Sequence, residues 1–265
     1  MLKFYQNKKF LDGFIELIKK FNKKILEIYN QDFNITYKDD KSPLTNADLE
    51  SNKIICEYLT LLNKNLKEVV NEDFLIISEE NKNLNYDYRK KYKYTWLVDP
   101  IDGTKEFLKK NGQFTVNIGL CKNSVPIFGI VSIPVSGEIY YGIEGLGSFK
   151  IHNNNKTKLE IPKKDLNKEG LNIVASSSHM SDETKDYINK FNNPKLVNIG
   201  SSIKLLYVAE NKADIYPRFG PTSEWDTCAA HAIVKYANGV VVRTDNKEEL
   251  KYNKENILNP FFLVY

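Results

Sequence analysis

Two acidic residues three positions apart are the first candidates for chemistry in this sequence. Asp99 and Asp102 lie in the segment 96–107, which reads WLVDPIDGTKEF and begins as an apolar run typical of a buried strand. The proline after Asp99 fixes its own φ and donates no N–H, so we expect the strand to stop there in a rigid exit. Two carboxylates on a stiff turn can face one point in space, which is the arrangement that an oxygen-preferring cation such as Mg²⁺ requires.

The residues that follow Asp102 are suited to binding a phosphate. Gly103 lets the backbone approach such a group closely, and the N–H groups of Gly103 and Thr104 can point toward it. The alternative is an Asx-type turn, in which Asp99 and Asp102 only accept hydrogen bonds from their own backbone. This segment alone leaves the two interpretations evenly balanced, so the rest of the chain has to decide between them.

Three further acidic residues stand at the expected ends of strands or starts of helices. Glu79 follows a short apolar run, where an acid is costly unless a positive group meets it, although a solvated loop start is common. Asp48 precedes a helix expected over 49–62, and its position alone favours a simple N-capping role. Asp226 opens a helix expected over 227–238.

The elements that position these acids change character along the chain. An amphipathic helix is predicted over 5–29. Turn residues separate three consecutive strands that predict an antiparallel meander: 114–121, 125–133 and 138–143. After the polar stretch 151–169, strands alternate with helices, which indicates an α/β half. We therefore expect a layered α/β (α+β) protein in two parts. Residues 1–155 would form a helix pair and an antiparallel sheet with most of the acids, and residues 156–265 a smaller α/β part.

Composition narrows the class of protein. The chain has no run of about 18 apolar residues, so no membrane span is expected, and its start lacks the cleavage site of a signal peptide. A net charge of +4 without a basic stripe argues against nucleic acid as a partner, whereas the lysine-rich face of the first helix leaves a peripheral membrane contact open. Three widely spaced cysteines predict reduced thiols in the cytoplasm and no zinc site: Cys56, Cys121 and Cys228. Only three arginines occur among the 38 basic residues, which makes each a candidate for a specific role: Arg89, Arg218 and Arg243.

Taken together, these separate motifs resemble those of one family. The acidic strand end 77–80 (ISEE), the turn 99–104 (DPIDGT) and the Trp225-Asp226 pair are similar to the signatures of the inositol monophosphatase superfamily of Mg²⁺-dependent, lithium-sensitive phosphomonoesterases. The resemblance covers nearly the whole chain and implies a layered αβαβα sandwich. Within the superfamily the chain is most similar to bacterial 3′(2′),5′-bisphosphate nucleotidases, in these stretches: 102–107, 111–117, 178–179, 200–204 and 216–221.

The resemblance implies a set of metal ligands. Glu79, Asp99, Asp102 and Asp226, with the carbonyl oxygen of Ile101, would hold two or three Mg²⁺ ions. The physical logic agrees, because converging carboxylates would repel a dianionic phosphate ester unless metal ions reversed the local charge. A metal ion also lowers the pKa of a bound water that can attack the phosphate.

The resemblance also implies catalytic and substrate-binding residues. Thr104 resembles the residue that positions the attacking water, with Asp48 accepting its hydroxyl proton and Glu79 completing the catalytic group. Arg218, in a stiff loop between two prolines, and the segment with Ser201, Ser202 and Lys204 are suited to a second phosphate. The implied substrate-binding residues are Gly103, Thr104, His179, Ser201, Lys204, Arg218 and Asp226.

Two phosphate sites favour a nucleotide bisphosphate over an inositol phosphate as the substrate. We therefore expect Mg²⁺-dependent hydrolysis of adenosine 3′,5′-bisphosphate to AMP and phosphate, by a cytoplasmic protein that is a monomer or a homodimer. An inositol or sugar monophosphate phosphatase with the same metal core is the alternative within the family. A nucleotide sensor without activity is the alternative outside it, and the complete carboxylate set together with Thr104 and Asp48 argues against a sensor.

Overall fold

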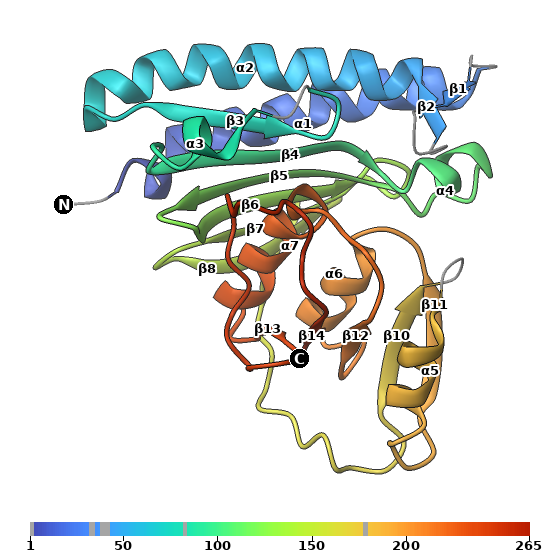
Figure 1. Ribbon diagram of the computed structural model, residues 1–265. Helices are drawn as coiled ribbons and strands as arrows, with labels where there is room; N and C mark the ends of the chain where they lie inside the picture. The colour runs from blue at the N-terminus through green and yellow to red at the C-terminus, as the bar shows by residue number, and fades with distance from the viewer. Residues whose placement is uncertain (1–2, 32–34, 38–42, 82–83, 177–179) are drawn as a thin grey trace.

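Two long helices cover one face of a large sheet, and a third helix lies against the other face (Figure 1). In the computed structural model, which describes residues 3–31, 35–37, 43–81, 84–176 and 180–265, the long helices are α1 (Lys8–Tyr29) and α2 (Asn46–Val70). The third helix is α7 (Glu224–Tyr236). The sheet has seven strands in the order β3-β4-β5-β6-β7-β8-β9. This architecture confirms the layered α/β fold that the sequence predicts.

Most of the large sheet is an antiparallel meander, as expected. Its strands are β3 (Phe74–Ser78), β4 (Tyr94–Asp102), β5 (Thr115–Lys122), β6 (Val125–Ile133), β7 (Glu138–Ile143), β8 (Gly147–His152) and β9 (Asn155–Leu159). Only the β3–β4 pair is parallel. A parallel pair needs a crossover connection, here the segment with the short helix α3 (Tyr86–Arg89), and it brings the ends of both strands to the same edge.

Aromatic side chains join α1 to the sheet. Phe14 of α1 lies against Trp96 of β4 and Phe128 of β6, with ring centroids 5.4 and 4.9 Å apart. All three side chains are fully buried. The burial of such large rings at helical spacing explains why α1 forms where the amphipathic pattern predicts it.

Three glycines allow α7 to approach the opposite face of the sheet. Gly119, Gly129 and Gly142 lie on β5, β6 and β7, directly beneath the backbone of α7. A Cβ atom at Gly129 would overlap the carbonyl of Ala229, so a larger residue there would push the helix away. The close approach fixes the start of α7, and with it Asp226, over the middle strands.

The second half of the chain alternates strands and helices, as predicted. β10 (Asn172–Ser176) and β11 (Lys195–Ile199) pair in parallel, and β12 (Tyr216–Arg218), β14 (Phe262–Val264) and β13 (Val241–Arg243) form an antiparallel sheet in that order. The helices of this half besides α7 are α5 (Asp182–Ile188) and α6 (Ile203–Ala209). The remaining elements are η1 (Phe4–Gln6), β1 (Ile35–Tyr37), β2 (Pro43–Thr45) and α4 (Thr104–Leu108).

The strand before the acidic pair is longer than expected. The sequence predicts that it stops at Asp99, but β4 continues through Pro100 to Asp102. The pairing of β4 with β5 is irregular between Asp99 and Asp102, and a bulge of this kind accepts proline because no ladder N–H is required there. Both acids therefore lie at an irregular strand end, and the prediction of a turn directly after Asp99 is wrong.

Other element boundaries also differ from the expected ones. The helix expected over 49–62 runs from residue 46 to 70, and the strand expected over 213–216 lies at 216–218. β9 was not predicted, because most of its residues are polar and exposed and it is held by pairing with β8. The large sheet therefore continues to Leu159, past the expected division at residue 155.

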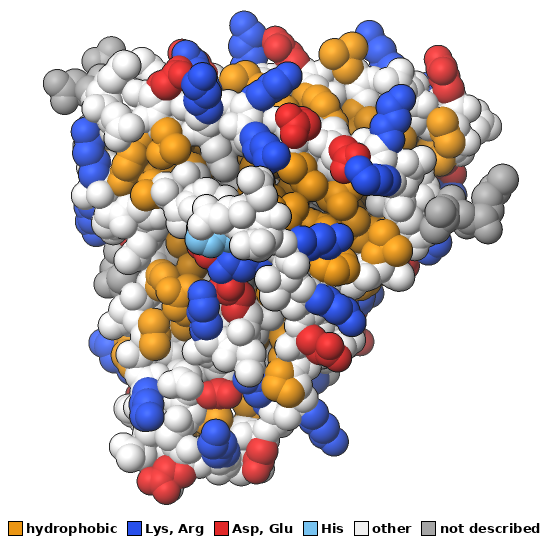
Figure 2. All heavy atoms as spheres, turned by 180° about the vertical axis from the view of Figure 1, so that it is seen from behind, with side chains coloured by type: hydrophobic (Ala, Val, Ile, Leu, Met, Phe, Trp, Pro, Cys, Tyr) orange, Lys and Arg blue, Asp and Glu red, His pale blue; other side chains and the backbone are white. Residues whose placement is uncertain are grey.

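The surface carries mixed charge. Figure 2 shows lysine and arginine side chains scattered among acidic and apolar ones on the face seen there, with no single basic stripe. A few of the surface lysines pair with acids one helical turn away, as Lys8 does with Asp12. Among the described residues, no helix is both long enough and apolar enough to cross a membrane.

Candidate active site

Three acidic side chains from three elements converge on one point. Glu79 follows β3, Asp99 lies on β4 and Asp226 lies in the first turn of α7. One carboxylate oxygen from each of the three lies within 4.8 Å of the other two. The parallel pairing of β3 and β4 brings Glu79 and Asp99 together, because the N–H of Glu79 donates to the carbonyl of Val98 next to Asp99. The close packing of α7 on the sheet brings Asp226 to the same point.

Backbone hydrogen bonds fix the orientation of two of these carboxylates, those of Asp99 and Asp226. Asp99 Oδ1 accepts from the N–H of Ile101 at 3.0 Å, so the Asx-type bond and the convergence with other acids occur together. Asp226 Oδ2 accepts from the N–H of Ser223 at 2.8 Å within the capping box of α7. Each acid therefore uses one contact to hold its own backbone and still points toward the shared space.

Asp102 lies beside this group. Its Oδ2 accepts a 2.5 Å hydrogen bond from the N–H of Ser202, and the hydroxyl of Thr115 and the amide of Asn117 lie 3.4 and 3.5 Å away. Ser202 is buried, and its hydroxyl donates to Asn117 Oδ1 at 2.8 Å. Ser202, expected from the sequence near a second phosphate, therefore also holds Asp102 in place.

The clustered carboxylates carry negative charge that a bound cation would compensate. Burial and the neighbouring acids raise the pKa of Asp99 and of Asp226 well above the ordinary range. Burial also raises the pKa of Asp102 to about 6. Ionised carboxylates this close are stable only with compensating positive charge, and an all-oxygen donor set fits a hard divalent cation. The described residues thus contain a candidate metal-binding group.

Thr104 and Asp48 meet at the edge of the same space. Thr104 Oγ1 lies 3.4 Å from Asp48 Oδ1 and 3.3 Å from the carbonyl oxygen of Ile101. Asp48 Oδ2 accepts from both the N–H and the hydroxyl of Thr45, which forms a capping box at the start of α2. The capping role expected for Asp48 is present, and its second oxygen faces Thr104.

Gly103 is required by the backbone between these residues. It precedes α4 with a φ of +94°, a conformation that other residues rarely adopt. A Cβ atom at this position would lie 3.1 Å from the carbonyl oxygen of Gln113 and 3.2 Å from Cβ of Ser201. The glycine therefore allows the segments carrying Thr104 and Ser201 to come together.

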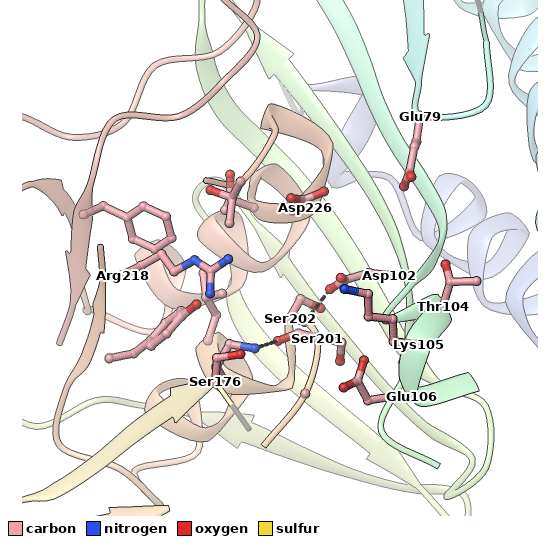
Figure 3. A pocket seen from close by; sticks show the side chains of 18 residues that line it. Glu79, Asp102, Thr104, Lys105, Glu106, Ser176, Ser201, Ser202, Arg218 and Asp226 are labelled. Carbon is pink, nitrogen blue, oxygen red and sulfur yellow. Dashed lines mark hydrogen bonds between the residues drawn. The ribbon is translucent and has the colours of Figure 1, made fainter. Parts of the chain in front are cut away.

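Acidic and basic side chains line one cavity of about 240 Å³ (Figure 3): Glu79, Asp102 and Asp226, with Lys105, Lys204 and Arg218. Glu79, Asp102 and Asp226 point into this space, with Thr104 on one side and Arg218 on the opposite side. Arg218 Nη2 donates to the carbonyl of Pro221 at 2.8 Å, which holds the guanidinium over the cavity. Ser201 also lines the cavity.

Lys204 is a buried cation in this cavity. Its Nζ donates to the carbonyl of Ser201 at 2.7 Å and lies 5.6 Å from the centre of the Tyr216 ring. Burial lowers the pKa of Lys204 to about 8, Asp102 opposes this change and Arg218 adds to it. An anion in the cavity would favour the charged form of this amine.

The structure brings together nearly every site residue predicted from the sequence. The exception is His179, which lies outside the described residues. Further residues that the sequence analysis did not propose line the same cavity: Lys105, Glu106, Ser176, Tyr216, Thr222 and Phe262. Lys105 and Tyr216 could have been suggested by adjacency, because each lies within two residues of a proposed one. Phe262 is far in the sequence from any proposed residue, and it reaches the cavity because β14 pairs with β12, which places it opposite Arg218.

The fold and the convergence of acids from β3, β4 and α7 define the class of protein. The Inositol monophosphatase family model matches residues 6–260, so the chain belongs to this family, as its motifs predicted. An IMPase from Thermotoga maritima has the same fold, with a TM-score of 0.74 at 22% identity over 96% of this chain and 91% of that one.

Closer similarity is found to one branch of the family. A Buchnera aphidicola protein named 3′(2′),5′-bisphosphate nucleotidase CysQ is 38% identical over 236 residues, 88% of this chain and 84% of that protein. The protein of the same name from Salmonella typhimurium is 37% identical over 257 residues, 96% of this chain and 98% of its own length. The crystal structure of CysQ from Bacteroides thetaiotaomicron matches with a TM-score of 0.73 at 36% identity, over 95% of each chain.

Proposed function

We propose that this chain is a 3′(2′),5′-bisphosphate nucleotidase that hydrolyses adenosine 3′,5′-bisphosphate to AMP and phosphate with Mg²⁺. The observation that carries the proposal is a single cavity lined both by the carboxylates of Glu79, Asp102 and Asp226 and by the cations Lys204 and Arg218. The names of the bacterial relatives support the same activity.

The proposed metal ligands are the four clustered acids and one carbonyl. Glu79, Asp99, Asp102 and Asp226, with the carbonyl oxygen of Ile101, would hold two or three Mg²⁺ ions. When bound, Mg²⁺ supplies positive charge to the phosphate and lowers the pKa of water. The distances among Glu79, Asp99 and Asp226 support this assignment.

Thr104 and Asp48 are the proposed pair for positioning the attacking water. If the Thr104 hydroxyl donates to Asp48 Oδ1, its lone pairs are left to accept a hydrogen bond from water. Asp48 then acts as the acceptor for the proton, with its other oxygen held by Thr45. A water held by the Thr104 hydroxyl in this way would be oriented for in-line attack on phosphorus.

Lys204, Ser201 and Arg218 are the proposed partners of the second phosphate, and Gly103 and Asp226 contact the substrate beside the metal site. A phosphate next to Lys204 favours the charged form of its amine, which burial disfavours. The planar guanidinium of Arg218 can donate two parallel hydrogen bonds to phosphate oxygens. His179 belongs to the same proposed group.

Both proposed parts of the chain contribute to this site. Glu79, Asp99 and Asp102 come from residues 1–155, whereas Asp226 and the cations come from residues 156–265.

The three cysteines are free thiols, which supports a cytoplasmic location.

The test is phosphate release from adenosine 3′,5′-bisphosphate and from inositol 1-phosphate, each measured with Mg²⁺ and with EDTA. We expect Mg²⁺-dependent release with a strong preference for the nucleotide. A preference for inositol 1-phosphate would keep the metal site and overturn the substrate. No release from either compound, with retained nucleotide binding, would favour a sensor.

A further inference from the structure

Arg89 is a buried arginine that the proposed chemistry does not use. It ends α3, on the segment that follows Glu79, and its side chain is only 2% exposed. Its guanidinium donates to Asn253 Oδ1 at 2.8 Å and to the carbonyls of Lys254 and Glu255 at 3.0 and 3.2 Å. The amide of Asn253 donates back to the carbonyl of Arg89 at 3.0 Å. Arg89 therefore binds the segment 253–255 from several directions.

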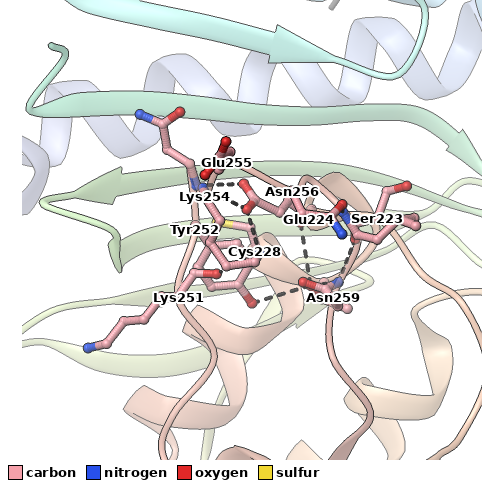
Figure 4. Close-up of polar contacts among 12 residues, drawn as sticks. Ser223, Glu224, Cys228, Lys251, Tyr252, Lys254, Glu255, Asn256 and Asn259 are labelled. Atoms are coloured by element: carbon pink, nitrogen blue, oxygen red, sulfur yellow. Dashed lines mark hydrogen bonds and ion pairs between the residues drawn. The ribbon is translucent and has the colours of Figure 1, made fainter. Parts of the chain in front are cut away.

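The segment 253–255 in turn binds Glu224, the first residue of α7 (Figure 4). Glu224 is fully buried. Its Oε2 accepts from the N–H of Asn253 at 2.5 Å, and its Oε1 accepts from the N–H and the Nζ of Lys254 at 2.9 and 2.5 Å. A buried carboxylate with this many donors is held in one position.

The amide of Asn259 holds the other side of the same helix start. It donates to the carbonyl of Ser223 at 2.7 Å and to the hydroxyls of Thr227 and Thr222 at 3.0 and 3.2 Å. Ser223 is the residue whose N–H bonds Asp226. The turn that carries Asp226 is thus fixed by Glu224 and by Asn259.

These contacts join the crossover segment that carries Arg89 to the start of α7, which carries Asp226. Arg89 belongs to the crossover that begins directly after Glu79, and Glu224 stands two residues before Asp226. The path from Arg89 through 253–255 to Glu224, which we name the Arg89 clamp, therefore connects the crossover that begins after Glu79 to the start of α7. Figure 4 shows the part of it around Glu224 and Lys254.

We propose that Arg89 and Glu224 are positioning residues, which set the affinity of the site for its divalent cation by fixing the start of α7 and with it Asp226. The proposal rests on the function proposed above only in taking Glu79, Asp99 and Asp226 as metal ligands. Residues that orient ligands from outside the coordination shell typically change metal affinity about 10- to 100-fold when they are removed. A purely structural role would lower stability and leave metal affinity unchanged.

The test measures Mg²⁺ affinity apart from activity. Wild type, Arg89→Met and Glu224→Gln are followed by thermal unfolding across a Mg²⁺ titration, in which the rise in Tm reports the Kd of the folded protein. Mg²⁺ dependence of phosphate release is measured beside it. We expect each variant to need about 10-fold more Mg²⁺ in both measurements, with a smaller loss of kcat at saturating Mg²⁺.

Arg243→Met is the matched control, because Arg243 pairs with Asp245 at the surface, away from the clamp. It should bind Mg²⁺ as wild type does. If Arg89→Met does not fold, Asn253→Ala removes the side-chain contacts to Arg89 and leaves the N–H that binds Glu224. The double variant of Arg89→Met and Glu224→Gln should lose less affinity than the sum of the single losses, because both act on one path.

Two results would overturn the clamp. One is wild-type Mg²⁺ affinity in the folded clamp variants, whatever their Tm without metal. The other is a wild-type protein that does not bind Mg²⁺, which would overturn the metal site as well. A wild type that binds Mg²⁺ but does not hydrolyse the bisphosphate would refute the proposed function alone, because the thermal titration still measures the effect of the clamp.

Discussion

The N–H of Ser202 donates a 2.5 Å hydrogen bond to Oδ2 of Asp102. Asp102 ends β4, and Ser202 directly precedes α6, so this bond joins the large sheet to the second half of the chain at the cavity. Burial raises the pKa of Asp102 to about 6 even though Lys204 and this hydrogen bond act to lower it. The protein therefore orients Asp102 but does not fully compensate the negative charge of its carboxylate, as expected of a residue that binds a cation.

Asp102→Asn should remove Mg²⁺-dependent phosphate release while the protein stays folded. The amide keeps the size of the side chain but not its charge, and the loss of a ligand, or of a residue that orients one, costs a metal site at least about 10- to 100-fold. Phosphate release is measured with the circular dichroism spectrum and the Tm as controls for folding. Activity close to that of wild type would remove Asp102 from the metal ligands.

Thr104→Ala should lower kcat more than it raises KM. The hydroxyl is proposed to orient water in the transition state, and a positioned proton acceptor contributes about 10²- to 10⁴-fold. The measurement is steady-state kinetics at saturating Mg²⁺, with Thr104→Ser as the matched variant that keeps the hydroxyl. A change in KM alone would mean that Thr104 binds substrate and does not act on the water.

Arg218→Ala should weaken hydrolysis of adenosine 3′,5′-bisphosphate more than that of adenosine 3′-monophosphate. The guanidinium is held by Pro221 at one side of the cavity, and a hydrogen bond to a charged group contributes about 1.5–3 kcal/mol, or about 10- to 100-fold. The ratio of kcat/KM for the two substrates is the readout, with Arg243→Ala as control. Equal losses on both substrates would exclude Arg218 from the second phosphate site.

Local signals in the sequence were enough to find most of the candidate site. Glu79 and Asp99 follow apolar runs in the sequence, and Asp226 lies at the start of a helix, so each could be singled out from its immediate neighbours. No local pattern predicted that these three side chains converge on one point; only the resemblance to a family implied it. Glu79, directly after β3, meets Asp99 on β4 because these strands are parallel, and Asp226 joins them because glycines let α7 approach the sheet.

Features that depend on distant contacts were not predictable from local patterns. β9 is a polar segment that forms a strand only because β8 offers it an edge. Arg89 is buried because its guanidinium finds carbonyls more than 160 positions away in the chain, at Lys254 and Glu255. Asp48 illustrates the mixed case, since its capping role is local and its contact with Thr104 is not.

The contribution of Asp102 to the stability of the metal-free protein should fall as pH rises from about 4 to about 6. The ordinary pKa of an aspartate carboxyl is 3.8, and burial raises that of Asp102 to about 6 in the folded protein, so the folded state binds the proton more tightly than the unfolded state does. Below the unfolded value both states are protonated and the full stability is present. Above about 6 both are ionised, and the difference of roughly two in pKa corresponds to a loss of about 3 kcal/mol.

Mg²⁺ should reverse this trend, because it binds the ionised carboxylates and its binding releases protons. The measurement is the free energy of unfolding in denaturant between pH 4 and pH 8, with EDTA and with saturating Mg²⁺. Asp99 and Asp226 have raised pKa values for the same reasons, burial and neighbouring acids, and they act in the same direction. Asp102→Asn, which cannot ionise, should show a shallower pH dependence in EDTA than wild type. A pH dependence in EDTA that is the same in Asp102→Asn and in wild type would mean that the charge of Asp102 is already compensated within the protein.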